Sequence, residues 1–298
     1  MSFKIVGIGE ILWDLLPSGR QMGGAPANFA YHAQALGAEA RVVSRVGRDP
    51  LGREILERLQ ALGLSTSAIQ MDASAPTGTV TVALSGDGQP RFTIHEQVAW
   101  DQLEITDAAL RAVVDADAVC FGSLAQRREP SHNTIQALAA AAPRNALRIF
   151  DINLRQQFFS RRLVEESLAL ANVLKLNDVE LPVLAGMLGL HGGPTDQLKQ
   201  LEQRYELRLV ALTRGARGSS LYSSGQWSED PGAPVSVKDT VGAGDAFTAA
   251  MTLGLLSSMP LEEINHRASE VARFVCACDG ATPRLPSGLR QGFEPVVC

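Results

Sequence analysis

Short apolar runs alternate with amphipathic stretches in the first part of the chain. The run KIVGIG at 4–9 is short, β-branched and ends at glycine, which predicts a buried strand. A helix is predicted over 25–36, a strand over 40–46 and a second helix over 51–62, and a glycine follows each helix. This βαβα alternation predicts a parallel sheet with helices on both faces.

A different pattern follows the second helix. Two alternating runs, 77–84 and 90–96, flank the sequence Ser-Gly-Asp-Gly at 85–88, which predicts a β-hairpin. A hairpin does not fit a pure βαβ series. We therefore expect it to form a small antiparallel sheet together with the extended segment 11–16, which carries Asp14.

The alternation of strands and helices then returns. Strands are predicted near 117–121, 147–152, 172–176 and 207–213, extended segments at 219–223 and 234–238, and helices over 243–256 and 261–277. The predicted fold is a doubly wound, mostly parallel α/β sheet with helices on both faces and a small antiparallel β lid. Because no linker or repeat divides the sequence, we expect residues 1–298 to form a single domain, with lid segments near 11–22 and 77–100.

Composition and charge narrow the class of protein. Hydrophobic residues make up 45% and charged residues 20%, so the chain can bury a core. Lys and Arg number 27 against 32 Asp and Glu, a net charge of −5, which disfavours a nucleic-acid partner. Four cysteines are too few for a disulfide framework. Without a signal-peptide pattern or a long uncharged apolar run, we expect a cytoplasmic protein that does not enter the membrane.

Several catalytic motifs are missing from the sequence. It contains no P-loop, no protein-kinase elements and no Gly-x-Ser-x-Gly, and its five histidines lack the spacing of metal ligands. Gly7-x-Gly9 begins like a dinucleotide-binding fingerprint, but Leu12 stands where the third glycine belongs. A nicotinamide-dependent oxidoreductase therefore stays a weak alternative that rests on this broken pattern alone.

The segment DTVGAGDAF at 239–247 carries the clearest chemistry. Its glycines lead directly into a predicted helix, whose first N–H groups have no internal partners and lie at the positive end of the helix dipole. Such a start binds anions, including a phosphoryl group in transfer. Asp245 falls in the first turn, where its carboxylate could take a proton from an attacking hydroxyl. The alternative is structural: an acidic residue in a first turn also simply complements the dipole.

A second glycine-rich segment, GGAPAN at 23–28, precedes the first predicted helix. Paired glycines allow positive φ and the close approach of a ligand, and a proline suits a first helical turn. The amide of Asn28, one turn in, offers a donor and an acceptor to a polyol. By itself the segment is more typical of an ordinary turn before a helix.

Together these two segments resemble the motifs of the ribokinase-like, or PfkB, family of carbohydrate kinases. GGAPAN is similar to the family's sugar-site motif, and DTVGAGDAF is similar to its C-terminal signature. Between them, KLNDVE at 175–180 resembles the family's Asn-x-x-Glu element, and LTRGARG at 212–218 resembles its nucleotide loop. The resemblance runs from about residue 5 to 285, and it implies a doubly wound α/β domain with a small β lid.

The resemblance implies a role for each matching residue, with ATP and Mg²⁺ as cofactors. Asp245 is the expected general base, beside an anion hole formed by Gly242, Ala243 and Gly244. The expected sugar ligands are Asp14, Gly24 and Asn28; the expected nucleotide contacts are Thr213, Gly215 and Gly218; and Asn177 and Glu180 are expected to orient Mg²⁺ through water. Asp239 and the carbonyl of Val241 match two ligands of a monovalent cation such as K⁺. Arg284 stands where some members of the family have a hydroxyl residue.

Three segments bear on the substrate. ILWD at 11–14, GGAPANFA at 23–30 and DINLR at 151–155 most resemble bacterial fructokinases. We therefore predict phosphorylation of D-fructose to fructose 6-phosphate. Arg155 also suits the carboxylate of 2-keto-3-deoxygluconate, so a kinase for that or another sugar is the alternative within the family.

Two further expectations concern partners and catalysis. A catalytically silent sensor of sugar or nucleotide is the non-enzyme alternative, but the sequence keeps Asp245 and both anion-hole glycines. The expected ligands are a small sugar and ATP. A homodimer through the lid would cover its free strand edges.

Overall fold

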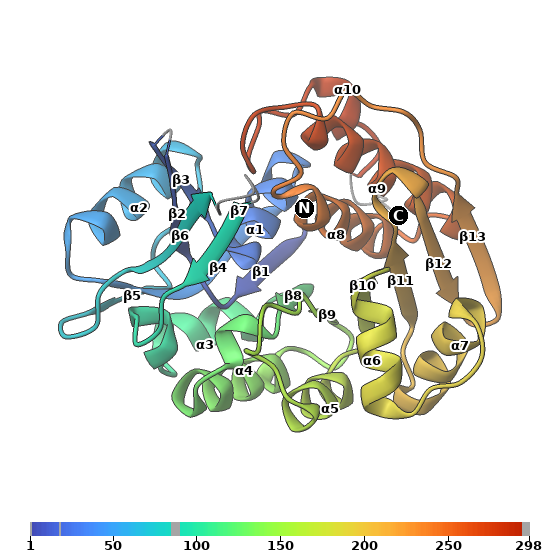
Figure 1. Ribbon diagram of the computed structural model, residues 1–298, viewed down its shortest axis with the longest axis horizontal. Helices are drawn as coiled ribbons and strands as arrows, with labels where there is room; N and C mark the ends of the chain where they lie inside the picture. The colour runs from blue at the N-terminus through green and yellow to red at the C-terminus, as the bar shows by residue number, and fades with distance from the viewer. Residues whose placement is uncertain (1, 18, 85–89, 294–298) are drawn as a thin grey trace.

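The computed structural model describes residues 2–17, 19–84 and 90–293 (Figure 1). In the described part of the chain the main sheet has nine strands, in the order β13-β12-β11-β10-β9-β8-β1-β4-β5. Neighbouring strands from β11 to β5 run parallel, whereas β12 and β13 form an antiparallel edge. The strands are β1 Lys4–Ile8, β4 Glu39–Gly47, β5 Ile69–Asp72, β8 Ala118–Phe121, β9 Leu147–Asp151, β10 Val173–Asn177, β11 Leu209–Thr213, β12 Ser219–Ser223 and β13 Gln226–Asp230.

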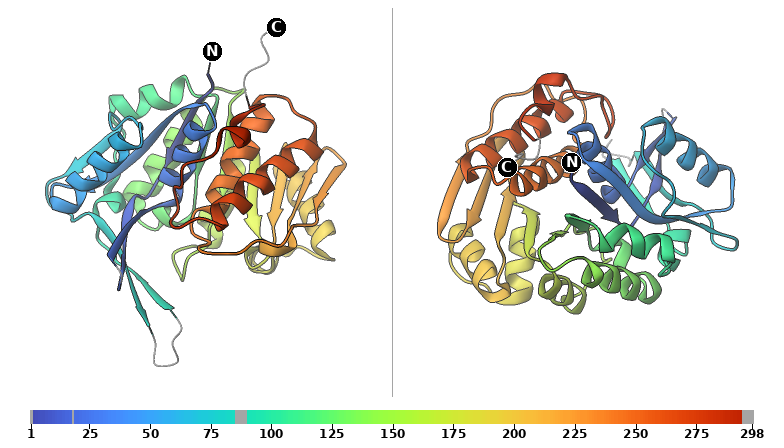
Figure 2. Two further views of the ribbon diagram at one scale, coloured as in Figure 1. Left: turned by 90° about the horizontal axis from the view of Figure 1, so that it is seen from above. Right: turned by 180° about the vertical axis from the view of Figure 1, so that it is seen from behind.

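Helices cover both faces of this sheet (Figures 1 and 2). One layer holds α3 Asp107–Val114, α4 Glu129–Ala141, α5 Arg161–Leu170, α6 Glu180–Leu188 and α7 Pro194–Tyr205. The other holds α1 Ala25–Ala35, α2 Pro50–Ala61, α8 Ala243–Leu256, α9 Leu261–Cys276 and α10 Ser287–Arg290. Short 3₁₀ turns are η1 Ala99–Gln102, η2 Leu124–Gln126 and η3 Gly215–Arg217. No described helix is long and apolar enough to cross a membrane.

Alternating side chains of the central strands supply the two cores. In β1, Ile5 packs with the α1 and α8 layer, while Val6 and Ile8 pack with the α3 to α7 layer. All three are at most 1% exposed. Because both faces of a parallel sheet are buried, its strands are apolar along their whole length, as the run at 4–9 predicted.

The predicted doubly wound sheet is confirmed, with one strand misplaced. The extended segment predicted at 234–238 is wrong, because no strand is assigned there and the edge strand is β13 instead. Ser224 and Gly225 both have positive φ (48° and 80°), which gives a two-residue turn that matches the twist of a tight hairpin. β5 was not among the predicted strands. The predicted turn at 85–88 lies outside the described residues.

A second sheet projects from the body of the molecule (Figure 2). Its strand order is β3-β2-β6-β7, with β2 Leu12–Leu16, β3 Gly19–Gly23, β6 Gly78–Leu84 and β7 Pro90–Ile94. The β6–β7 hairpin is antiparallel as predicted, and β2 and β3 form a second antiparallel hairpin that was not predicted. The pair that joins the hairpins, β2 and β6, runs parallel.

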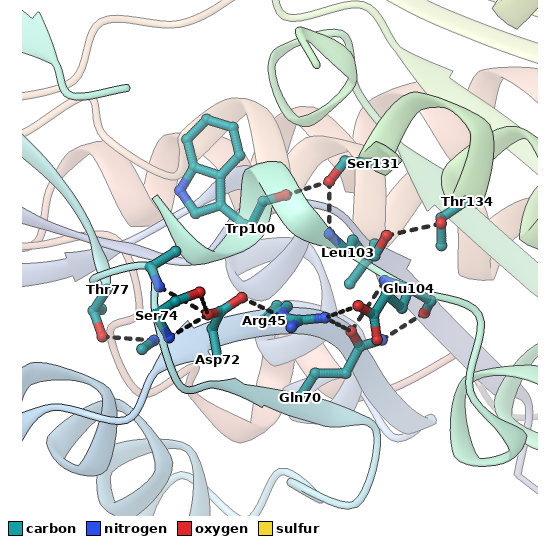
Figure 3. Close-up of polar contacts among 12 residues, drawn as sticks. Arg45, Gln70, Asp72, Ser74, Thr77, Trp100, Leu103, Glu104, Ser131 and Thr134 are labelled. Atoms are coloured by element: carbon teal, nitrogen blue, oxygen red, sulfur yellow. Dashed lines mark hydrogen bonds and ion pairs between the residues drawn. The ribbon is translucent and has the colours of Figure 1, made fainter. Parts of the chain in front are cut away.

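Polar contacts fix the base of this small sheet to the main one (Figure 3). Asp72, at the end of β5, forms an ion pair of 2.7 Å with Arg45 of β4, and its Oδ1 accepts from two backbone N–H groups of the segment that leads to β6, at 2.8 Å each. On the far side of the β6–β7 hairpin, the Ser131 hydroxyl donates to the carbonyl of Trp100 (2.6 Å) and accepts from the N–H of Leu103 (2.8 Å). The segment that leads into β6 and the segment that follows β7 are therefore both held by groups of the main body.

Candidate active site

Polar residues collect at the carboxyl ends of the central parallel strands. Glu10 follows β1, Asp151 ends β9, Asn177 ends β10 and Thr213 ends β11. The strand order reverses beside β1, because β4 lies on one side of it and β8 on the other. In open α/β sheets, ligands bind outside the carboxyl ends of the strands at such a reversal.

The start of α8 forms one wall of this site. Gly242 precedes the helix with φ 79°, and a Cβ on it would lie 2.5 Å from the carbonyl oxygen of Ala281, so only glycine fits. Because Gly242 is also the N-cap residue, no capping side chain covers this helix start. The first N–H groups of α8 are thus suited to bind an anion.

Asp245 lies in the first turn of α8, where its side chain is partly buried. Burial raises the pKa of its carboxyl group to about 6, and the negative charge of Asp151 acts in the same direction. The Asn28 side-chain amide opposes this shift, because its nitrogen donates to Oδ2 of Asp245 at 2.8 Å. The positive charges of Lys175 and Arg155 oppose it as well. At neutral pH the carboxylate is therefore ionised, and it is more basic than an exposed aspartate.

The start of α1 forms the facing wall. Gly24 precedes the helix with φ 114°, and a Cβ there would lie 2.5 Å from the carbonyl oxygen of Glu10. A Cβ on Gly23 would lie 2.5 Å from Oδ2 of Asp14, so the carboxylate of β2 packs directly against this turn. The compact turn allows Asn28 of α1 to contact Asp245 of α8, although the two residues are 217 positions apart in the sequence.

The guanidinium of Arg155 lies among the carboxyl groups of the two walls. Burial raises the pKa of Asp14 to about 6, and the charge of Arg155 opposes that shift. The same charge acts to lower the pKa of Glu10 and of Asp245. Four of the residues predicted from the sequence, Asp14, Asn28, Arg155 and Asp245, therefore come together in one cluster.

Asn177 and Glu180 form a rigid turn after β10. The two carboxylate oxygens of Glu180 accept from the N–H of Leu154 (3.0 Å) and of Asn177 (2.8 Å), while Oδ1 of Asn177 accepts from the N–H of Val179 and of Glu180, at 2.9 Å each. Burial raises the pKa of Glu180, and the charge of Lys175 opposes the shift. Because these oxygens already accept backbone N–H groups, the turn fits contact with hydrated Mg²⁺ better than direct ligation. Within the described ranges no group of three or more His, Cys, Asp or Glu side chains could hold a metal alone.

The predicted nucleotide loop follows β11. This strand is the neighbour of β10, which ends at Asn177, on the side away from β1. Thr213 pairs with Asn177 in the β10–β11 register, and its carbonyl accepts from the N–H of Asp178 at 3.0 Å. Gly215 and Gly218 have φ of 57° and 78°, which shapes the loop around η3. The loop lies beside the Asn177 turn.

The Asp239–Val241 turn precedes α8. Oδ1 of Asp239 accepts from the N–H of Val241 at 3.0 Å and closes the turn. The neighbouring loop is tied to α1, because the carbonyl of Ala281 contacts Nε2 of His32 at 2.9 Å and the Tyr31 hydroxyl donates to the carbonyl of Pro283 at 3.0 Å. The carboxylate and carbonyl of the Asp239–Val241 turn are oxygen donors of the kind a monovalent cation takes.

Three buried charged residues of the site carry no role in the sequence-based prediction. Glu10 is 2% exposed, and burial together with the charge of Asp245 raises its pKa to about 7. Asp151 and Lys175 form an ion pair of 3.0 Å. Burial acts to lower the pKa of Lys175, but the charges of its acidic neighbours, Asp151 first, raise it above its ordinary value. Asp151 belongs to the segment DINLR and Lys175 to the segment KLNDVE. Their position at or near the end of a predicted strand was the signal that could have identified them.

Comparison with known proteins gives one consistent result. A family model described as pfkB family carbohydrate kinase matches residues 19–287. A fructokinase of Klebsiella pneumoniae is 33% identical over 267 residues, covering 86% of this chain and 85% of that protein. An uncharacterized sugar kinase of Pyrococcus horikoshii is 31% identical over 301 residues, covering 94% and 93%.

Solved structures agree with the sequence comparisons. The structure of the Pyrococcus horikoshii protein in complex with ATP has a TM-score of 0.76 at 30% identity, covering 93% of this chain and 94% of that one. A double-mutant fructokinase of Vibrio cholerae, with fructose, ADP and a potassium ion bound, has a TM-score of 0.78 at 25% identity, covering 98% of both chains.

Proposed function

Because this chain belongs to the PfkB family of carbohydrate kinases, we propose that it transfers the γ-phosphate of ATP to the 6-hydroxyl of D-fructose. As a member of that family it is a phosphotransferase acting on a sugar hydroxyl. The observation that carries the assignment of the site is the 2.8 Å contact between Asn28 and Asp245, which joins the two glycine-started helices around one partly buried carboxylate.

Asp245 is the proposed general base. Its carboxylate takes the proton of the sugar hydroxyl as the hydroxyl oxygen attacks the γ-phosphorus and ADP leaves. The N–H groups that follow Gly242 at the start of α8 neutralise the charge that develops on the transferred phosphoryl group. Asn28 holds the carboxylate in place through its hydrogen bond.

ATP binds beside the loop after β11 in this proposal, in contact with Thr213, Gly215 and Gly218. Support comes from the ATP-bound Pyrococcus horikoshii relative and from the position of the loop next to the Asn177–Glu180 turn. Mg²⁺, held through water by that turn, neutralises charge on the phosphates.

A monovalent cation is proposed for the Asp239–Val241 turn. The potassium ion of the Vibrio cholerae neighbour supports it. Arg284 lies in the loop next to this turn. It directly follows Pro283, whose carbonyl accepts from the Tyr31 hydroxyl.

Asp14, Gly24 and Asn28 are proposed to bind the sugar, with the small sheet as a lid over it. Fructose is supported by the relatives described as fructokinases and by the local charges. Two carboxyl groups, Asp14 and Asp245, lie near the single guanidinium of Arg155. That balance favours a neutral sugar over the sugar acid 2-keto-3-deoxygluconate, whose carboxylate would meet Asp14 as well as Arg155.

The test is ADP release from Mg·ATP with fructose, 2-keto-3-deoxygluconate, ribose and mannose, each in KCl and in NaCl. We expect rapid turnover with fructose alone, faster in KCl. If only the keto acid is turned over, it replaces fructose as the proposed substrate. Arg155 then becomes the proposed ligand of its carboxylate. Absence of turnover with every sugar, while ATP still binds, would refute the proposed reaction.

A further inference from the structure

A buried ion pair lies between the sheet and the start of α8. Lys175 of β10 and Asp151 of β9 are register partners on neighbouring strands, and their side chains are 8% and 7% exposed. Nζ of Lys175 donates to Oδ1 of Asp151 at 3.0 Å. The other carboxylate oxygen accepts from the hydroxyl of Thr248, in the second turn of α8, at 2.8 Å.

This pair is directed at the backbone of the anion hole. A Cβ placed on Gly244 would lie 3.1 Å from Nζ of Lys175, so the ammonium group packs against the first turn of α8. The Thr248 hydroxyl also lies 3.0 Å from the carbonyl oxygen of Gly244. A positive charge in this buried position acts over a short distance with little screening by water.

Anchoring the helix does not by itself account for the lysine. The hydrogen bond from Thr248 to Asp151 already joins α8 to β9. A buried ion pair must also overcome the desolvation of both charges, and apolar residues of similar volume often stabilise a protein as well or better. The position of the charge beneath the anion hole is therefore the feature that needs a reason.

We propose that Lys175 is a positioning residue for phosphoryl transfer, whose buried ammonium group, held by Asp151, adds positive charge behind the anion hole of α8. Lys175 neither gains nor loses a proton in the reaction. It acts through the backbone of Gly244, whose amide would face the transferred phosphoryl group. This inference rests on the proposed function, because it needs the start of α8 to be the phosphoryl site.

The test compares two doubly neutral variants. Asp151→Asn with Lys175→Met removes this ion pair while leaving an acceptor for Thr248, and Asp72→Asn with Arg45→Met removes the ion pair between β5 and β4 of the main sheet. We expect the first variant to lose about 10- to 100-fold in kcat, with KM for fructose and for Mg·ATP changed little. The control variant is expected to keep the kcat of the unaltered protein.

A second readout separates charge from folding. Calorimetry measures binding of Mg·ADP alone, and then of Mg·ADP with aluminium fluoride and fructose, which imitates the transferred phosphoryl group. We expect the Asp151/Lys175 variant to bind Mg·ADP normally and the fluoride complex at least tenfold more weakly. Should that variant fail to fold, Lys175→Gln, which keeps an amide donor for Asp151, takes its place in both measurements.

The outcomes distinguish this inference from the proposed function. If the unaltered protein forms no fluoride complex and shows no turnover with fructose, the proposed function fails. If it does both, and the variant matches it in kcat and in affinity for the fluoride complex, the role of Lys175 is refuted. A variant that loses thermal stability and all ligand affinities together would identify a purely structural ion pair, which also overturns the inference.

Discussion

The two helices that meet at the site begin in the same way but lie among different charged groups. Both α1 and α8 follow a glycine with positive φ, and in neither does the N-cap residue supply a capping side chain. At α1 the buried carboxyl group of Glu10 lies near the first turn, where the backbone N–H of Ala25 acts to lower its pKa, so an acidic group of the protein itself faces that helix start. At α8 the first turn carries Asp245 and is backed by the ammonium of Lys175.

This difference suits the start of α8, rather than that of α1, to the phosphoryl site proposed for it. A glycine before a helix only permits close approach to the first N–H groups. Which group approaches depends on charges that come from other elements: Glu10 after β1 in one case, and Asp151 with Lys175 from β9 and β10 in the other. We therefore expect changes at α8 to affect the chemical step, and changes at α1 to affect mainly sugar binding and the alignment of Asp245.

The largest effect is expected from removing the proposed base, Asp245. Asp245→Asn keeps the size of the side chain and loses the proton acceptor, so kcat should fall by about 10²- to 10⁴-fold while the fold is kept. Steady-state kinetics with fructose and circular dichroism measure the two properties. Asp14→Asn is the matched comparison and should raise KM for the sugar more than it lowers kcat. A kcat for Asp245→Asn equal to that of the unaltered protein would remove Asp245 from the mechanism.

The two N-cap glycines allow the comparison to be tested directly. Alanine is strained at both, since φ is positive and its Cβ would lie 2.5 Å from a backbone oxygen, of Ala281 for Gly242 and of Glu10 for Gly24. We expect Gly242→Ala to lower kcat by about 10²-fold, because it displaces the anion hole. Gly24→Ala should raise KM for the sugar about tenfold with a smaller change in kcat. The same kinetic pattern in both variants would contradict a division of labour between the two helices.

Asn28 links the two helices, and its removal should have an intermediate effect. Asn28→Ala deletes the hydrogen bond to the Asp245 carboxylate, and bonds to charged groups contribute about 1.5–3 kcal/mol. A decrease of about 10- to 100-fold in kcat/KM is therefore expected. Gln34→Ala serves as the control on the same helix, because its side chain donates to the carbonyl of Gly63 away from the site. Equal kinetics for both variants would mean that the Asn28 contact does not act in catalysis.

The glycine-rich motifs could be predicted from sequence because their geometry is local. The helix predicted over 243–256 is α8 with the same ends, and Gly242 and Asp245 lie where the motif put them. The strand β13 was misplaced because the Ser-Gly turn before it is a weaker turn signal in the sequence than the proline-rich segment after it. β5 was missed because a four-residue edge strand has little hydrophobic pattern of its own.

The buried charges could not be predicted, because they depend on strand order. Asp151 and Lys175 meet only because β9 and β10 are neighbours in parallel register. Glu10 reaches the start of α1 only because the chain first passes through the β2–β3 hairpin and then returns. The roles proposed for the predicted residues stay proposals until the variants are measured.

The smallest expected effect concerns pH and the carboxyl pair formed by Glu10 and Asp245. The pKa of Asp245 is raised to about 6, and a base must be deprotonated, so kcat/KM should fall as the pH decreases through about 6. The pKa of Glu10 is raised to about 7, so above that pH a second negative charge develops beside Asp245 and opposes the phosphate. We expect a decline of about two- to threefold between pH 7 and 8. Glu10→Gln keeps the shape of the protonated acid and cannot ionise, so it should keep the acid limb and lose the decline. If Glu10→Gln instead shifts the acid limb and keeps the decline, then Glu10 is not the group that titrates near pH 7.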